Sequence, residues 1–566
     1  MPQNKAILPK SLAASLVVTC LINAPSFAQP SAGSLMQQLQ SEQPLITLPP
    51  AQPSLAPGRS VPTTPDQQKV FIKQFKFLGN QKLSDQDLQA LVAPYKNTSL
   101  SFADIKGITE LIGKHYRQKG WLARALVPAQ DVTDGVLTIQ VVEAVVGEIR
   151  IDNQSKRVST ERIESWIDNG ITRKSGLSLG QLDRTMLTLN DLPDVNAVSS
   201  LQSGTKEGET DLNVVITDKP RVDGFVDVDN YGDPATGIWR AVGSVYINSP
   251  LGFGDQAIVY GLYSEGVSFG RVSYTVPVGQ DGLRLGVNAS ALNYRVINRD
   301  WDTLRLGGQS QSGGLEAAYP ILRSRPANLY ALGFYNYSNY ENRSDGNITN
   351  RYKTSVLSAG LSGNLMDGLG GGGTNNGSLI FSVGVIILNG SPLQSFNEET
   401  INTGGQFTKI RYSLNRLQNI SKDLSGYVSL SGQFANKNMD SSEQMFMGGP
   451  YAVRAYATGQ GAATQGNLLT AELRLRLPHQ FIATAFYDLA NVQMLKSSDY
   501  PGNTGANMYL LQGLGLSLTW NAPKNILVRA TWAHRTGPLS DAAQTYLSSN
   551  GGLSPNRFWL NASISF

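Results

Sequence analysis

From about residue 220 to Phe566, apolar and polar residues alternate in short segments that are separated by Gly, Asn, Asp and Pro turns. In the segment 469–477 every odd position is apolar and every even position is polar or charged, and the terminal segment 558–566 alternates as cleanly. A period of two places successive side chains on opposite faces of a strand, so one face meets an apolar environment and the other meets water. This pattern is typical of outer-membrane β-barrels, whose strands of ~9 to 11 residues turn apolar positions to lipid and polar positions to the lumen.

The length of this C-terminal region, residues 220–566, predicts the number of strands. Strand numbers in bacterial single-chain barrels are even. Sixteen strands leave roughly 22 residues for each strand with its turn or loop, whereas fourteen leave roughly 25 and eighteen only roughly 19. We therefore expect a transmembrane β-barrel of 16 antiparallel strands.

Helical periodicity appears in the region before the alternating segments. Between Val70 and Val142 the pattern predicts a single strand over residues 70–77, then two helices, the first beginning near Ser84, and then two further strands. The same order of elements recurs about 78 residues later. We expect two α+β modules of the order βααββ, at residues 67–144 and 145–219. A three-stranded sheet leaves a free edge to which an extended peptide can add, so the modules either bind other chains or act as a mere spacer.

The first 28 residues, 1–28, predict a removable secretion signal. Lys5 and Lys10 precede an apolar stretch, which is followed by the small-x-Ala pattern of residues 26–28. Removal of this segment also removes Cys20, the single cysteine, so the mature chain has no disulfide.

Residues 29–66 join this signal to the first module. They begin with a short helical candidate, in which Leu35, Met36 and Leu39 are the apolar positions, and they continue as a proline-rich linker. The segment is therefore either a tethered N-terminal helix or a disordered tail.

Composition excludes several classes of function. Only 16% of the 566 residues are charged, and the formal net charge of +4 comes without a dense block of Lys and Arg, which disfavours nucleic acid as a partner. After the predicted signal, no stretch reaches the ~18 to 20 apolar residues of a transmembrane helix. The three histidines are scattered, and the sequence has no His-Glu-x-x-His, Gly-x-Ser-x-Gly or phosphate-loop pattern. We therefore expect no enzyme activity, no cofactor and no metal.

Three groups of motifs carry a resemblance to a known family. They are Pro-Ala-Gln-Asp at 128–131 in the first module, Asp-Asn-Tyr-Gly at 229–232 and Asn-Ser-Pro-Leu-Gly at 248–252 where the barrel begins, and the segment 448–456. Together they resemble the two-partner secretion transporters, the TpsB family of haemolysin and haemagglutinin exporters within the POTRA-barrel superfamily. The resemblance covers essentially the whole mature chain, and it implies that the modules are polypeptide-transport-associated (POTRA) domains.

The resemblance is most specific at Val453, Arg454, Ala455 and Tyr456, where the superfamily has Val-Arg-Gly-Tyr at the tip of loop six. It implies that this tip folds back into the barrel and that Arg454 pairs with an aspartate in a Phe-x-Asp pattern, here Phe486 and Asp488. A guanidinium in a partly dry channel needs such a bidentate acceptor. Ala455 replaces the glycine of the family, and if that glycine serves a positive φ, alanine is strained there.

The resemblance also implies a function. The protein is expected to be a translocator in the outer membrane of a Gram-negative bacterium, which captures an unfolded secreted exoprotein by its N-terminal secretion domain and exports it without nucleotide hydrolysis. The POTRA domains then lie in the periplasm, and the N-terminal helix with Leu35, Met36 and Leu39 plugs the resting pore. Trp559 and Phe566 resemble the C-terminal signal that the barrel assembly machinery recognises; periplasmic chaperones and outer-membrane lipid are the further partners.

Three other classes of protein stay open at this point: a barrel assembly or insertion factor, a passive porin, and a soluble adhesin with a β-rich C-terminal domain. Two modules rather than a longer series, together with the N-terminal helix, favour export over assembly. A porin accounts for neither the modules nor the inward loop.

Overall fold

The computed structural model of the chain describes residues 30–43, 49, 51, 69–206, 208–297, 304–500, 507–539, 544 and 554–566. The predicted secretion signal and most of the proline-rich linker lie outside these residues. Within the described ranges, no helix has the length and apolar character needed to cross a membrane.

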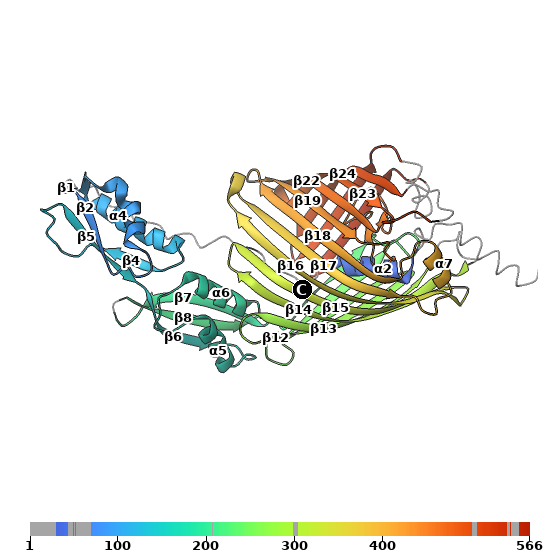
Figure 1. Ribbon diagram of the computed structural model, residues 1–566, viewed down its shortest axis with the longest axis horizontal. Helices are drawn as coiled ribbons and strands as arrows, with labels where there is room; N and C mark the ends of the chain where they lie inside the picture. The colour runs from blue at the N-terminus through green and yellow to red at the C-terminus, as the bar shows by residue number, and fades with distance from the viewer. Residues whose placement is uncertain are drawn as a thin grey trace, which may run out of the picture.

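Sixteen strands form a closed antiparallel barrel, in which the last strand pairs with the first. This confirms the predicted fold class. Figure 1 shows the barrel from the side. The strands are β9 (Val222–Asp229), β10 (Arg240–Asn248), β11 (Gln256–Ser264), β12 (Val267–Val278), β13 (Leu283–Arg295), β14 (Gly307–Arg323), β15 (Ala327–Ser344), β16 (Asn347–Asp367), β17 (Gly373–Ile387), β18 (Gly405–Asn419), β19 (Leu424–Ala435), β22 (Gln465–Arg476), β23 (Phe481–Gln493), β24 (Met508–Ala522), β25 (Ile526–Arg535) and β26 (Asn556–Ser565).

Strand β24 shows why these segments form a barrel wall. Its side chains alternate between buried and exposed along most of the strand. The exposed positions include Leu514, Leu516 and Leu518, each more than 40% exposed, and they point away from the lumen. Leucines in this arrangement are stable only against lipid, because large apolar patches on a water-facing surface are disfavoured.

The first module contains the predicted order of elements together with additional short elements. Strands β2 (Gln74–Leu78), β5 (Val136–Glu143) and β4 (Ala123–Leu126) form its sheet in the order β2-β5-β4, and helices α3 (Asp85–Val92) and α4 (Phe102–Gln118) lie between β2 and β4 in sequence. A short helix, η1 (Ala93–Tyr95), follows α3.

The expected single strand from Val70 to Phe77 is wrong. The strand is interrupted at Lys73, whose backbone amide donates to the carbonyl of Gly135 at 2.7 Å. The residues before the break form β1 (Lys69–Ile72), which pairs with β3 (Thr98–Ser101) instead of the main sheet. Residues on both sides of the break favour strands, so local sequence does not reveal where β1 ends and β2 begins. The two strands differ in the strand with which each one pairs.

The second module repeats this plan with longer strands. Its sheet has the order β6-β8-β7, formed by β6 (Val145–Asn153), β8 (Glu209–Asp218) and β7 (Val195–Ser203), with helices α5 (Thr160–Gly170) and α6 (Leu179–Asn190) packed on it. Trp166 is the largest fully buried side chain there, and its indole donates to the Thr188 hydroxyl at 3.1 Å. Each helix begins after a serine whose hydroxyl accepts a backbone N–H, which is the usual N-cap.

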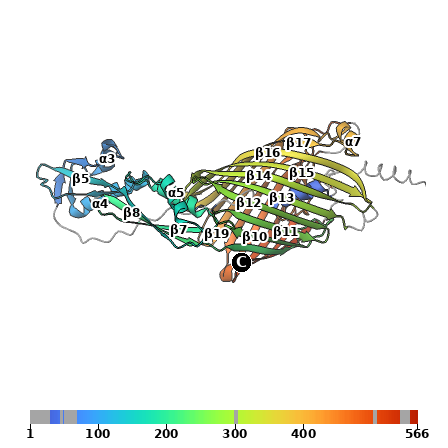
Figure 2. The same cartoon turned by 90° about the horizontal axis from the view of Figure 1, so that it is seen from below.

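The second module lies against one end of the barrel (Figure 2). The Arg323 guanidinium donates twice to the Asp191 carboxylate, at 2.8 Å each, and Arg184 donates to the carbonyl of Pro320 at 2.9 Å. The Lys219 ammonium donates to two backbone carbonyls of the turn after α6, and burial lowers the pKa of this group. The contacts of Arg323 and Arg184 hold the module in a defined orientation on the barrel rim, and those of Lys219 fix the end of the module to α6.

The remaining elements are the N-terminal helix and short elements in loops and turns. They are α2 (Ala32–Glu42), η3 (Leu369–Gly371), α7 (Gln394–Glu399), the strand pair β20 (Met445–Phe446) and β21 (Ala462–Ala463), and η4 (Pro478–Gln480). Helix α2 lies inside the barrel (Figure 1).

Candidate functional site: the lumen of the barrel

The loop between β19 and β22, residues 436–464, folds into the lumen. Its short strands β20 and β21 pair with each other, and the loop tip, which we define as Val453–Tyr456, packs against the inner faces of β22 to β26. Val453, Ala455 and Tyr456 are all at most 3% exposed. The tip therefore lies inside the barrel.

Arg454 is bound by two carboxylates of the barrel wall. Its Nε and Nη2 donate to the two oxygens of Asp488 at 2.8 Å each, and its Nη1 donates to Glu472 at 2.8 Å. The backbone amide of Arg454 adds a bond to Asp488 at 3.1 Å, and the Thr470 hydroxyl donates to the same carboxylate at 3.1 Å. Asp488 is fully buried. The structure thus brings the two sequence-predicted residues together and adds Glu472 as a second acceptor.

The rest of the tip site is aromatic. The Arg454 guanidinium lies 3.4 Å from the centre of the Phe486 ring, in cation–π contact. Phe486 fits because Gly515 has no side chain: a Cβ there would lie 2.4 Å from the ring. The indole of Trp559 donates to the carbonyl of Arg454 at 2.7 Å. The tip is therefore fixed by its backbone as well as by its charge.

Charges balance within this cluster. Arg474 donates to Glu472 at 2.8 Å, so Arg454 and Arg474 face the carboxylates of Glu472 and Asp488. A buried ion pair stabilises little by itself, but removal of one partner leaves the other buried and unpaired. The tip is consequently held in one place as long as all members are present.

Ala455 adopts no positive φ, so the strain expected if the position required one does not arise. Its methyl group instead occupies space left by a glycine on β24, since a Cβ on Gly513 would lie 2.4 Å from the Cβ of Ala455. The glycine that this contact requires is therefore Gly513 of the barrel wall, and the loop tip can carry alanine.

Helix α2 occupies the other side of the lumen. Leu35, Met36 and Leu39 are each at most 5% exposed and pack on side chains of β10 to β19, whereas the tip packs on β22 to β26. The helix begins with a capping box between Ser31 and Ser34. The helix and the tip thus fill opposite halves of the same channel.

Polar contacts hold the start and the middle of α2. At its start, the Ser31 hydroxyl lies 2.9 Å from the Ser441 hydroxyl, and the amide of Ala32 donates to Asn342 at 2.8 Å. In its middle, the Gln37 amide donates to the carbonyl of Ser442 at 2.9 Å. Ser441 and Ser442 belong to the inward loop, so the helix contacts the loop as well as the wall.

At its end, α2 is held by an ion pair that the sequence analysis did not identify. Arg240 donates to both oxygens of Glu42, at 3.0 and 3.1 Å, and to both oxygens of Asp229, at 2.8 and 3.1 Å. Asp229 was noted only as part of a motif at the start of the barrel. Its partner Arg240 lies eleven positions later in the sequence, on the next strand of the barrel. Glu42 is about 200 residues from both, so no local sequence pattern connects the three residues.

The ion pair at Glu42 and the loop tip are joined through Tyr231. The Asp229 carboxylate accepts the backbone N–H of Tyr231 at 2.9 Å, and the Tyr231 ring packs edge-on against Trp559, with ring centres 5.8 Å apart. Thr458, close to the tip, donates to the carbonyl of Tyr231 at 2.7 Å. A continuous set of contacts therefore connects the helix to the tip.

Two further predicted residues lie at the C-terminal strand. Trp559 faces the lumen and contacts the tip, whereas Phe566 is 60% exposed and its backbone exchanges two hydrogen bonds of 3.0 Å with Gly224 of the first strand.

Beyond α2, the Asn364 side chain donates to the carbonyl of Pro49 at 2.9 Å near the end of β16 that faces the modules. In the part of the chain that the structure describes, no three His, Cys, Asp or Glu side chains are grouped to hold a metal ion.

Comparison with known proteins places this architecture. A family model described as haemolysin secretion/activation protein ShlB/FhaC/HecB matches residues 208–510, and a model of the ShlB-type POTRA domain matches residues 70–144. The heme/hemopexin transporter protein HuxB of Haemophilus influenzae is 26% identical over 506 residues, which cover 87% of this chain and 88% of that protein. The outer membrane transporter CdiB of Dickeya dadantii is 22% identical over 414 residues, covering 71% and 72%.

Solved structures show the same fold. CdiB from Escherichia coli aligns with a TM-score of 0.68 at 20% identity, over 96% of this chain and 100% of that one. BamA from Haemophilus ducreyi lacking POTRA domains 1–3 aligns with a TM-score of 0.51 at 14% identity, over 88% of this chain and 100% of that one.

A closed barrel with a filled lumen, preceded by POTRA-like modules, defines an outer-membrane protein transporter. Its barrel lies in the outer membrane and its modules lie in the periplasm. The chain belongs to the haemolysin secretion/activation family, ShlB/FhaC/HecB, whose members export a partner protein across the outer membrane.

Proposed function

We propose that this transporter rests in a closed state and that the partner exoprotein opens it. The observation that carries the proposal is the division of the lumen, in which α2 fills the side of β10 to β19 and the loop tip fills the side of β22 to β26. An unfolded chain and both occupants do not fit together. Helix α2 is the plug, and both the plug and the tip move before a polypeptide passes.

We place capture of the partner at the free edge of β7 in the second module. This strand has nine residues and pairs only with β8, and it exposes Val198 (59%) and Leu201 (38%). An edge strand of this kind accepts an extended peptide by main-chain hydrogen bonds. The contacts of Arg323 and Arg184 at the rim keep this edge near the barrel opening.

The remaining features of the proposal concern biogenesis and energy. Residues 1–28 direct secretion, the modules extend over 67–144 and 145–219, and the barrel begins near residue 220. The barrel assembly machinery recognises the last strand, which contains Trp559 and is followed directly by Phe566, and periplasmic chaperones deliver the chain. No catalytic step is involved: folding of the partner outside the cell removes it from the unfolded pool and so draws export forward.

Deletion of residues 70–219 tests this function. We expect the variant to reach the outer membrane as a heat-modifiable barrel and to secrete no partner, because capture is lost while the barrel is retained. Secretion at the level of the full chain would contradict capture by the modules. Failure to assemble would be recognised by loss of heat modifiability, and the substitutions on β7 and β4 described below then carry the test.

A further inference from the structure

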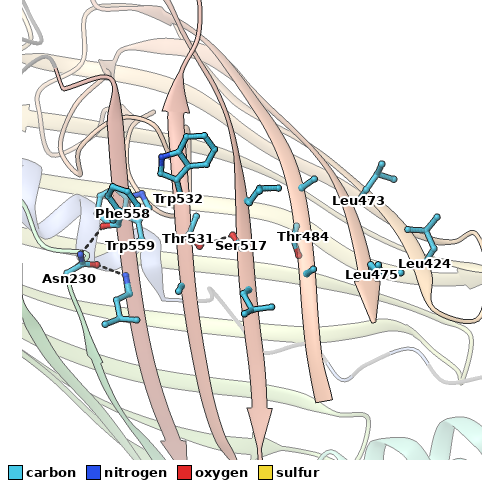
Figure 3. A pocket seen from close by; sticks show the side chains of 16 residues that line it. Asn230, Leu424, Leu473, Leu475, Thr484, Ser517, Thr531, Trp532, Phe558 and Trp559 are labelled. Atoms are coloured by element: carbon cyan, nitrogen blue, oxygen red, sulfur yellow. Dashed lines mark hydrogen bonds between the residues drawn. The ribbon is translucent and has the colours of Figure 1, made fainter. Parts of the chain in front are cut away.

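The outer wall of the barrel is hollowed over strands β22 to β26. The hollow has a volume of about 800 Å³ and is lined almost entirely by apolar groups, with Leu473 and Leu424 on one side and Trp532 and Phe558 on the other (Figure 3). The outside of a barrel is otherwise convex, so a hollow of this size requires a local cause.

The strand register supplies that cause. Leu475, Ala483, Leu518, Ala530 and Leu560 lie side by side across five neighbouring strands, so large and small side chains alternate in one row. In the adjacent row, Ala485 again stands between two leucines, Leu473 and Leu516.

Ala483 and Ala485 together form a trough along β23. Neighbouring strands are about 4.8 Å apart, so the leucines of β22 and β24 stand roughly 10 Å apart across the trough. The leucine side chains themselves occupy part of this distance, and the space left between them is about as wide as one hydrocarbon chain. A bulky or branched occupant does not fit between them.

The trough opens toward the periplasmic face of the membrane. Ala483 lies three residues from Gln480 of the periplasmic turn, a distance of about 10 Å along a strand. The trough is therefore within the inner leaflet, with its mouth at the level of the lipid headgroups.

The turns at this mouth are basic. Lys422, Arg476 and Lys524 are exposed there, and Asp423 is the acidic residue within the turns 420–423, 477–480 and 523–525. The adjacent turn after β22 also carries the exposed His479. Cations at the headgroup level attract anionic lipid.

We propose that this trough binds one acyl chain of an anionic phospholipid of the periplasmic leaflet, with its phosphate near Lys422 and Lys524. Lipid tails are as apolar as leucine, so burial alone gives no preference for the trough over the rest of the wall. Selective binding comes from close packing between the leucine rows together with the charge at the headgroup.

The position of this lipid connects it to the barrel seam. The last strand pairs with β9 over only five residues, Asn561–Ser565, but with β25 over nine. Past the end of this short ladder, the Asn230 side chain donates to the carbonyl of Phe558 at 2.9 Å and accepts the amide of Leu560 at 2.8 Å. Phe558 and Leu560 line the hollow, so a bound lipid covers the wall next to the seam.

The test is native mass spectrometry of the full chain, released from nanodiscs that contain equal amounts of phosphatidylglycerol and phosphatidylethanolamine. The wild type is expected to retain one phosphatidylglycerol. The trough is filled in the variant Ala483→Leu with Ala485→Leu, which is expected to retain at least fivefold less. The matched control is Ala289→Leu with Ala291→Leu, an exposed alanine pair on β13 whose neighbours across the strands include Gly313 and Gly270, so no trough exists there. The control is expected to retain lipid like the wild type.

A second variant, Lys422→Gln with Lys524→Gln, leaves the wall unchanged and is expected to abolish the preference for phosphatidylglycerol. Equal retention by the filled variant and its control would overturn the trough, and an unchanged lipid preference in the lysine variant would overturn the headgroup contact. A dimer that disappears when the trough is filled would also overturn the proposal, because a second copy of the chain would then be the occupant.

Discussion

At the scale of single residues, Arg454 joins the inward loop to the wall. Replacement by Ala leaves the fully buried Asp488 without its partner, for which we expect a loss of about 3 to 5 kcal/mol in the stability of the tip contact. Partner secretion should fall, and limited proteolysis of the loop 436–464 should become faster. The control is Arg305→Ala, whose side chain is 78% exposed in its ion pair with Asp345 and should leave both readouts unchanged. Secretion at the wild-type level would rule out a role for this contact in export.

Ala455 and Gly513 form a second residue-scale prediction. A methyl group added by Gly513→Ala meets the Cβ of Ala455 at 2.4 Å, so we expect a loss of about 1 to 3 kcal/mol in a denaturant titration. The double variant with Ala455→Gly should recover most of that loss, because the methyl group is then carried by the wall instead of the tip. Additive losses in the double variant would show that the two residues do not share this space.

At the scale of elements, the edge of β7 yields a third prediction. Val198→Lys places a charge on the edge, which protects edge strands from pairing. Binding of the partner's secretion domain to the full chain should weaken about tenfold. The matched control is Leu126→Lys on the four-residue edge strand β4 of the first module, where binding should change little. A larger effect at Leu126 would place capture in the first module.

The same scale shows how far the sequence predicts this protein. Alternation along β22 and β26 predicted strands with one lipid face and one lumenal face, because the period of two is a local property of the chain. The pair β1 and β3 was not predicted, since two strands of four residues carry no periodic signal of their own. Arg454 and Asp488 were found through a motif, whereas Glu42 and Arg240 belong to no motif and meet only after the chain folds.

At the scale of the whole molecule, the proposed function makes the closed state depend on α2 as the plug. Glu42→Gln removes a charged hydrogen bond worth about 1.5 to 3 kcal/mol, so we expect the frequency of channel opening in planar bilayers to rise roughly tenfold or more. Deletion of residues 30–43 should raise single-channel conductance permanently. Glu110→Gln, an exposed carboxylate in the first module, is the control and should behave as the wild type. Unchanged conductance after the deletion would show that α2 does not obstruct the channel.

The covalent link between α2 and β1 has a last consequence. Pro49 accepts a hydrogen bond from Asn364 at the periplasmic end of β16, whereas α2 lies deeper in the lumen. A helix that leaves the lumen stays covalently linked to the protein, so it rebinds as an intramolecular ligand. Its effective concentration is on the order of millimolar, which a separate peptide would have to match to bind equally well. If α2 acts as the proposed plug, this link lets the transporter close again after each exported chain without an energy source, and we expect proteolytic cleavage between α2 and β1 to leave the channel permanently open.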